Sequence, residues 1–153
     1  MDTSKNYIIT SGKGSDRFEL VSFDKALYDS KLANYNLVRV SSILPPNCLE
    51  QHGVTAKPGS VLFTAYASIS DNKEGIISAA VGVGIPENPT EVGVIMEYSC
   101  CNTKEVSIDI VSQMVQSAMR LRGSKIKDIK IASAEVSVSK GIYSTAVAAL
   151  AMW

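Results

Sequence analysis

The sequence has few of the residues that several common kinds of active site need. Its 153 residues include one histidine, His52, and three cysteines, Cys48, Cys100 and Cys101. A Ser-His-Asp site would depend wholly on His52, which stands in a polar, glycine-containing loop. The vicinal cysteine pair lacks the spacing of a CxxC site, and no histidine is near it in the sequence. We therefore expect no metal site, and we interpret the cysteines as buried or reduced thiols.

The chain also lacks an excess of charge and a long apolar run. Fifteen basic and 15 acidic residues cancel, so no net field favours nucleic acid or an anionic membrane as a partner. No window approaches the run of about 18 apolar residues that a membrane-spanning helix needs. The first residues show no basic segment followed by an apolar one, as a signal peptide would. We expect a cytoplasmic protein with no nucleic-acid partner and no membrane partner.

The composition of the chain suits one compact domain. Hydrophobic residues make up 46% of the sequence and charged residues 20%, which is typical of globular proteins. A length of 153 residues is common for a single domain, and no repeat, low-complexity segment or linker divides the sequence. We predict one domain over residues 1–153.

Periodicity and turn residues predict a series of strands and two helices. Ser22 is a plausible N-cap for the first helix, and Asn102 with Glu105 forms a possible capping box for the second. A glycine turn is expected to follow the first strand. The expected strands lie within 6–14, 36–46, 61–70, 75–86, 91–100, 128–138 and 144–152, and the expected helices within 22–35 and 103–122.

The order of these elements predicts an α+β fold, a layered α/β sandwich with largely antiparallel sheets. Short turn-forming links join the strands expected at 61–70, 75–86 and 91–100. We therefore expect these three strands to be antiparallel neighbours.

One short stretch, RVSSILPP at residues 39–46, carries the functional prediction. Ser41 and Ser42 follow an apolar run, and Pro45 and Pro46 end the strand because neither can donate a hydrogen bond to a ladder. Taken alone, an adjacent serine pair is most often only the end of a strand.

Five segments in order give that pair a context. SFDKAL, NLVRVSSILPP, TAYASISD, ISAAVGVGIP and GVIMEYS together resemble the pyruvoyl-dependent arginine decarboxylases from about residue 20 to the C-terminus. The resemblance implies the fold of that family and self-cleavage between Ser41 and Ser42, into a β chain of residues 1–41 and an α chain of residues 42–153. It also implies a pyruvoyl group made from Ser42, which replaces pyridoxal phosphate, forms a Schiff base with the substrate and needs no metal.

The self-cleavage that this resemblance implies explains why residue 42 must be a serine. Ser42 Oγ can attack the carbonyl carbon of Ser41 and replace the amide by an ester, and β-elimination with hydrolysis then leaves a ketone and releases ammonia. An amide is planar and resonance-stabilised. We therefore expect a strained backbone, held by the strand end and clamped by Pro45 and Pro46. Alanine could not replace Ser42, because the hydroxyl oxygen is first the nucleophile and then the leaving group.

Glu97 is the candidate catalytic acid. The resemblance implies that it protonates the carbanion left after loss of CO₂. Its neighbours Val94, Ile95 and Met96 are apolar, so partial desolvation could keep a proton on the carboxyl group near neutral pH. The alternative is a glutamate at a strand edge that pairs with a surface lysine or arginine.

Further residues, Ser41 among them, are implied to bind the substrate. Asp24 would recognise the guanidinium group with two parallel hydrogen bonds, although a carboxylate in the first turn of a helix is also favoured by the helix dipole. Asn36 would polarise the Ser41 carbonyl or hold the substrate carboxylate, unless it is a turn asparagine. Ala33 and Tyr35 would line the distal end of the pocket, where the familiar archaeal members have glycine and valine.

The implied activity is the conversion of arginine to agmatine and CO₂, which would serve polyamine synthesis or acid tolerance. Three alternatives remain: a pyruvoyl decarboxylase for another amino acid such as histidine, an uncleaved non-catalytic homologue, and a small α+β binding domain. The resemblance also implies a homotrimer of processed protomers, or a dimer of trimers, with each site at a subunit boundary.

Overall fold

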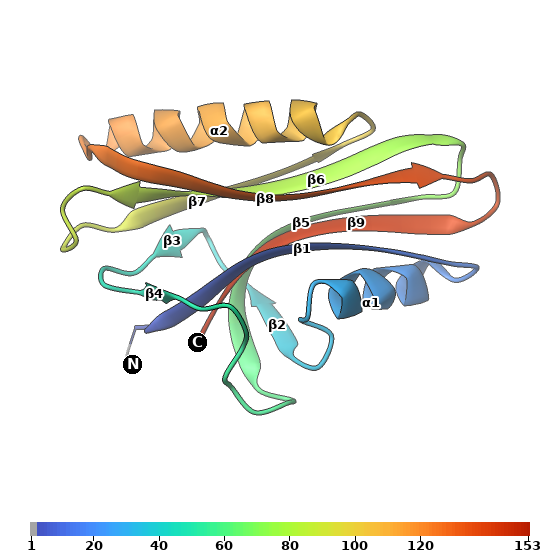
Figure 1. The fold of residues 1–153 in the computed structure, drawn as a ribbon, viewed down its shortest axis with the longest axis horizontal. Coiled ribbons are helices and arrows are strands. Elements are labelled where there is room, and N and C mark those ends of the chain that lie inside the picture. Colours follow the sequence, from blue (N-terminus) through green and yellow to red (C-terminus); the bar gives the residue numbers. More distant parts are fainter. Residues whose placement is uncertain (1–2) are drawn as a thin grey trace.

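The protein is described by a computed structural model that covers residues 3–153. These residues form nine strands and two helices in a single sandwich (Figure 1). The elements are β1 (Asn6–Asp16), α1 (Glu19–Asp29), β2 (Asn36–Arg39), β3 (Ile43–Leu44), β4 (Leu49–Glu50), β5 (Val61–Asp71), β6 (Gly75–Pro86), β7 (Gly93–Cys100), α2 (Lys104–Leu121), β8 (Ile126–Val138) and β9 (Tyr143–Met152).

The sandwich has four layers. A five-stranded sheet has the order β2-β5-β9-β1-β4, and a four-stranded sheet has the order β3-β7-β6-β8. The sheets face each other, α1 covers the outer face of the first sheet, and α2 covers the outer face of the second (Figure 1). Among the strand pairs of residues 3–153, only β1–β4 and β2–β5 are parallel. The predicted α+β sandwich with largely antiparallel sheets is confirmed.

Small and branched side chains fill the space between the sheets. Ala65, Ala148 and Leu150 of the five-stranded sheet share one core cluster with Val81 and Ile95 of the four-stranded sheet. All five are fully buried. Because such an interior is closely packed and apolar, a carboxylate at its edge loses much of its hydration.

The predicted glycine turn after the first strand is wrong. Gly12 and Gly14 lie inside β1, which pairs with β9 along its length. A Cβ on Gly12 would lie 2.2 Å from the carbonyl oxygen of Ala26, and one on Gly14 would lie 2.5 Å from Lys25 Cβ. The two glycines therefore allow α1 to pack closely against the sheet.

Both predicted helix caps are also wrong. Ser22 is buried within α1, and its hydroxyl shares a 2.7 Å hydrogen bond with Thr145 Oγ1. The N-cap of α2 is Thr103, which makes no side-chain capping bond. Asn102 Oδ1 instead accepts a hydrogen bond from the Thr103 backbone N–H at 2.8 Å, so the expected box with Glu105 does not form.

The chain changes sheets at two places where the sequence patterns predict continuity. β5 and β6 follow each other but lie in different sheets, and only β6 and β7 form the predicted antiparallel pair. The strand expected at 36–46 is broken. Its first part, β2, pairs with β5, and its second part, β3, pairs with β7, so residues 40–42 cross from one sheet to the other.

Candidate active site

Ser41 and Ser42 lie where the chain crosses between the two sheets, in the link from β2 to β3 (Figure 1). On one side, the Val40 N–H donates to the Thr64 carbonyl of β5 at 3.3 Å. On the other side, the Ile95 N–H of β7 donates to the Ser42 carbonyl at 2.9 Å. The peptide bond between the serines is therefore held from both sheets.

The backbone at Ser42 is strained. Its φ is 77°, in the left-handed region, where a Cβ comes too close to the following carbonyl oxygen and costs about 1–2 kcal/mol. Such conformations persist only where the surrounding structure imposes them. The anchors to β5 and β7 supply that constraint, so the strain expected at the serine pair is present at its second member.

Glu97 contacts the serine pair directly. Ser42 Oγ donates a hydrogen bond to Glu97 Oε2 at 3.3 Å. Strand alternation places Glu97 on the same face of β7 as Ile95, which packs between the sheets. Burial raises the pKa of Glu97, although the Ser42 hydroxyl and the charge of Arg39 act in the opposite direction. Glu97 therefore keeps a proton to higher pH than an exposed glutamate does.

Arg39 is a site residue for which the sequence patterns predict no role. Its guanidinium carbon lies 4.0 Å from the ring centroid of Tyr66, in the range of a cation–π contact. The Tyr66 ring lies 6.4 Å from the ring of Phe23 in α1. This stack links the end of β2 to α1, and the arginine charge lowers the pKa of Glu97. The only sequence signal for it was its position in the Arg-x-Ser-Ser block.

Three of the predicted substrate-binding residues lie on or just after α1, with Asp24 in the middle of the helix, not in its first turn, and Ala33 and Tyr35 beyond its end. Asp24 is exposed and lines a surface depression that includes Tyr28 and Asp29. Ala33 and Tyr35 line a second depression that includes the same two residues. Both depressions involve α1, on the outer side of the five-stranded sheet, whereas Glu97 faces the space between the sheets. One chain therefore does not bring these residues to Ser42.

Asn36 is also separated from the serine pair. It begins β2, and its side-chain Nδ2 donates to the Gly59 carbonyl at 2.8 Å. Four residues of extended strand, about 13 Å, separate it from Val40. Its amide group therefore holds the loop before β5 in this chain and does not polarise the Ser41 carbonyl.

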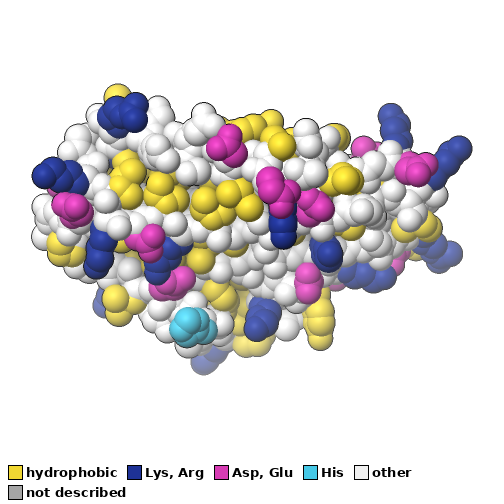
Figure 2. Space-filling model, turned by 45° about the horizontal axis from the view of Figure 1, so that its top comes forward, with side chains coloured by type: hydrophobic (Ala, Val, Ile, Leu, Met, Phe, Trp, Pro, Cys, Tyr) yellow, Lys and Arg dark blue, Asp and Glu magenta, His cyan; other side chains and the backbone are white. Residues whose placement is uncertain are grey.

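The described part of the chain offers little for other kinds of site. Residues 3–153 contain no group of three or more His, Cys, Asp or Glu side chains placed to hold a metal ion. His52 is exposed in its loop, and the three cysteines are free. On the face in Figure 2, basic and acidic side chains are interspersed, without a large patch of one sign. Neither helix within 3–153 is long and apolar enough to cross a membrane.

The four-layer fold places a strained serine beside a half-buried glutamate, and a fold of this kind occurs in a pyruvoyl enzyme. A solved structure of a pyruvoyl-dependent histidine decarboxylase at pH 8 is similar with a TM-score of 0.52 and 14% sequence identity. The match covers 64% of this chain and 52% of that one, so this chain spans about half of its length. At this identity the likeness concerns the fold.

Sequence comparison specifies the family. The sequence model described as pyruvoyl-dependent arginine decarboxylase matches residues 6–153. A relative of that name from Pyrococcus abyssi is 38% identical over 154 residues, which is 99% of this chain and 96% of the relative. One from Methanococcus aeolicus is 36% identical over 146 residues, 95% of this chain and 87% of the relative. The chain belongs to the pyruvoyl-dependent arginine decarboxylase family, as the five segments predict, and this family implies a covalently bound pyruvoyl group.

Proposed function

We propose that this chain is a self-processing decarboxylase that converts arginine to agmatine and CO₂ with a pyruvoyl group made from Ser42. The observation that carries this proposal is the strained Ser42 whose hydroxyl donates to the half-buried Glu97. Membership of the family supports both the amino-acid substrate and the choice of arginine.

Self-cleavage begins with Ser42 Oγ. It attacks the carbonyl carbon of Ser41, the C–N bond to Ser42 breaks, and the nitrogen takes up a proton, which leaves an ester. Loss of the Ser42 Cα proton and cleavage of the Cβ–Oγ bond then release the Ser41 carboxylate. Water finally replaces the nitrogen of residue 42, which leaves as ammonia. The products are a β chain of residues 1–41 and an α chain of residues 42–153. The left-handed φ favours the first step, because the strained amide is raised in energy relative to the ester.

The surroundings of residue 42 suit a pyruvoyl group. The Ile95 N–H holds the carbonyl of residue 42, which becomes the amide carbonyl next to the new ketone. A pyruvoyl group supplies a carbonyl that withdraws electrons from the Cα of an amino acid as CO₂ leaves. The fixed Ile95 donor stabilises the negative charge that develops on the neighbouring amide oxygen.

Glu97 supplies the proton that completes the reaction. Its Oε2 lies next to residue 42, so its carboxyl group can deliver a proton to the substrate Cα that has lost CO₂. Because burial raises its pKa, a larger fraction of the enzyme carries this proton near neutral pH than would be the case with an exposed glutamate.

The two products of cleavage stay together. β1 belongs to the β chain but lies between β9 and β4 inside the five-stranded sheet. It pairs with β9 from Tyr7↔Met152 to Asp16↔Tyr143, and α1 packs against it. The fragments separate only when the sheet itself unfolds.

The complete site requires a second copy of the chain. Asp24 lies in the middle of α1, Ala33 and Tyr35 follow the helix, and Asn36 holds the loop before β5. We assign them to the site of a neighbouring protomer, in a homotrimer or a dimer of trimers. There Asp24 binds the substrate guanidinium, Asn36 lies near the cleavage bond, and Ala33 and Tyr35 line the distal end of the pocket. The bulk of Tyr35 shapes that end.

An apolar surface near the serine pair supports this assembly. Val38, Val61 and Phe63, on the neighbouring strands β2 and β5, are 45%, 53% and 38% exposed. Large apolar side chains grouped at a sheet edge are typical of a surface that another protein covers. The edge strand β2 ends two residues before Ser41, so a copy docked there would reach the site.

The test is an assay of the purified protein with arginine, ornithine, lysine and histidine, with product identified by mass spectrometry. We expect agmatine from arginine, no amine from the other three, and no product with the Ser42→Ala variant. Fully cleaved protein that forms no agmatine would rule out arginine as the substrate, and histamine would identify the alternative activity.

A further inference from the structure

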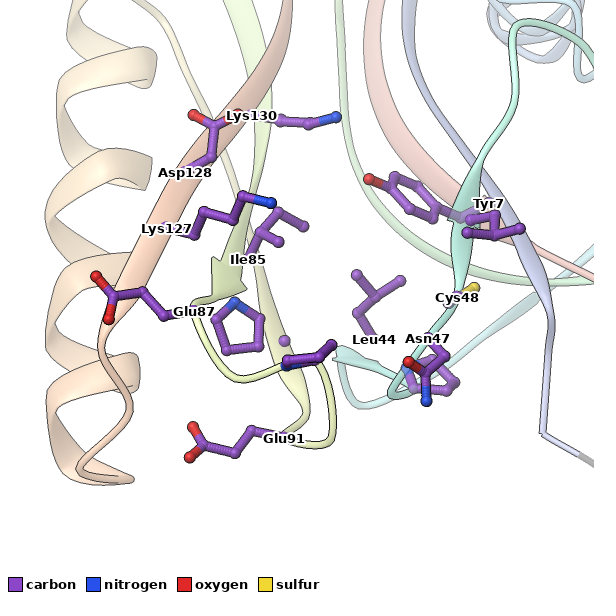
Figure 3. A pocket seen from close by; sticks show the side chains of 15 residues that line it. Tyr7, Leu44, Asn47, Cys48, Ile85, Glu87, Glu91, Lys127, Asp128 and Lys130 are labelled. Carbon is purple, nitrogen blue, oxygen red and sulfur yellow. The ribbon is translucent and has the colours of Figure 1, made fainter.

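A cavity lies at the other end of β3 from Ser42. Its volume is about 420 Å³, within the range of small-molecule sites. It opens between the sheets, and its lining includes Tyr7 of β1, Leu44 of β3 and Ile85 of β6 (Figure 3). Neither Ser42 nor Glu97 lines it, so it is separate from the proposed catalytic site.

A β-bulge gives this cavity two lysines. The β6–β8 ladder is regular up to Asp128, then skips Lys127 and resumes at Ile126. In a regular strand, Lys127 and Lys130 would face opposite sides of the sheet. A bulge adds one residue and turns its side chain, and both lysines line the cavity together with Ile85. Figure 3 shows their amino groups extending toward the space between the sheets.

The positive charge inside the cavity is only partly neutralised. Lys130 Nζ is hydrogen-bonded to Glu50 of β4. Lys127 has no ion pair among residues 3–153. Figure 3 shows the carboxylates of Glu87 and Glu91 pointing away from Lys127. The hydrogen bond to Glu50 raises the pKa of Lys130, and the charge of Asp128 acts on Lys130 in the same direction.

We propose that this cavity binds a small carboxylate with an apolar body. The carboxylate lies against the Lys127 ammonium and the remaining N–H donors of Lys130, and the apolar body packs on Leu44 and Ile85. An organic cation would meet like charge at both lysines. An inorganic anion would leave the apolar wall in contact with water.

The site adjoins the segment that begins at residue 42. Leu44 pairs with Gly93 of β7, and β3 has only two residues. A ligand against Leu44 therefore holds β3 onto β7. The binding itself does not depend on cleavage, so it can be measured on the uncleaved chain and on the processed protein.

Octanoate is the probe. We expect it to bind the full-length Ser42→Ala chain and the wild-type protein alike in calorimetric titrations, and to shift the backbone amide NMR signals of Leu44 and Ile85. Octylammonium, with the same chain and the opposite charge, should bind at least about tenfold more weakly. Lys127→Met keeps the apolar stem but removes the charge, and the loss of one charge-assisted contact weakens octanoate binding by about tenfold.

Lys140→Met is the matched control, because Lys140 is an exposed lysine between β8 and β9 and does not line the cavity. Its affinity for octanoate should equal that of wild type. The proposal is overturned if octanoate does not bind, if octylammonium binds equally well, or if Lys127→Met and Lys140→Met bind octanoate with the same affinity. None of these outcomes bears on decarboxylation, which is measured separately.

Discussion

The strain at residue 42 can be measured with two variants that cannot be cleaved. Ser42→Ala and Ser42→Gly both lack Oγ, so both remain one chain and both lose the hydrogen bond to Glu97. They differ only in the Cβ atom. At a φ of 77° that atom is in a disfavoured position, and glycine has none.

Two opposing effects set the expected difference in stability. Removal of the Cβ relieves about 1–2 kcal/mol of left-handed strain. The greater freedom of glycine in the unfolded chain works against it by roughly 0.5–1 kcal/mol. We therefore expect the free energy of unfolding of Ser42→Gly to exceed that of Ser42→Ala by up to about 1.5 kcal/mol.

Urea unfolding followed by circular dichroism measures this difference. All variants must be compared at one protein concentration, because assembly stabilises the folded state. Ser137 of β8 provides the control pair, since it is exposed and pairs with Ile76 in an ordinary ladder. There glycine should be less stable than alanine by roughly 0.5–1 kcal/mol. If the glycine variant is less stable than the alanine variant at both residue 42 and residue 137, the proposed strain at residue 42 is refuted.

Three further predictions concern the residues of the proposed site. Glu97→Gln should still be cleaved, because its amide oxygen accepts the Ser42 hydrogen bond, but its turnover should fall by about 10²–10⁴-fold; turnover equal to wild type would remove Glu97 as the acid. Asp24→Asn should raise the KM for arginine about 10- to 100-fold with normal cleavage, and unchanged kinetics would exclude Asp24. Burial raises the pKa of Glu97 and its protonated form is the active one, so wild-type turnover should decline as pH rises through that raised pKa. A decline confined to the range of an ordinary glutamate would contradict this role.

The sequence patterns predict most elements but not the sheet to which each belongs. Stretches of alternating polar and apolar residues, or of β-branched residues, predict the bounds of β5, β6 and β7 to within two residues. Alternation shows only that a strand has two faces, so it cannot reveal that β5 and β6 lie in opposite layers. The break at residues 40–42 is hidden for a similar reason, because the apolar residues on either side of it read as one strand. Only the pairing with β5 and β7 separates them.

The candidate site also has features that the sequence predicts and features that depend on how the strands pair. The motif and the IMEY segment identify Ser42 and Glu97, and the β3–β7 ladder brings these residues together across 55 positions of sequence. Strand register decides that Arg39 stacks on Tyr66 and that the Lys127 side chain points into the cavity. Register cannot be predicted from the types of the neighbouring residues. Asp24 and Asn36 match positions of the family motif. Within one chain they lie away from Ser42, and we assign them to the site of a neighbouring protomer.

The most direct test of the account is the intact mass of freshly purified protein under denaturing conditions. The account predicts two fragments, residues 1–41 and 42–153, whose masses sum to that of the 16.4 kDa chain plus water minus ammonia. The larger fragment should resist Edman sequencing and react with a hydrazine. A single 16.4 kDa polypeptide with an unmodified serine at position 42, under every condition tried, would contradict it.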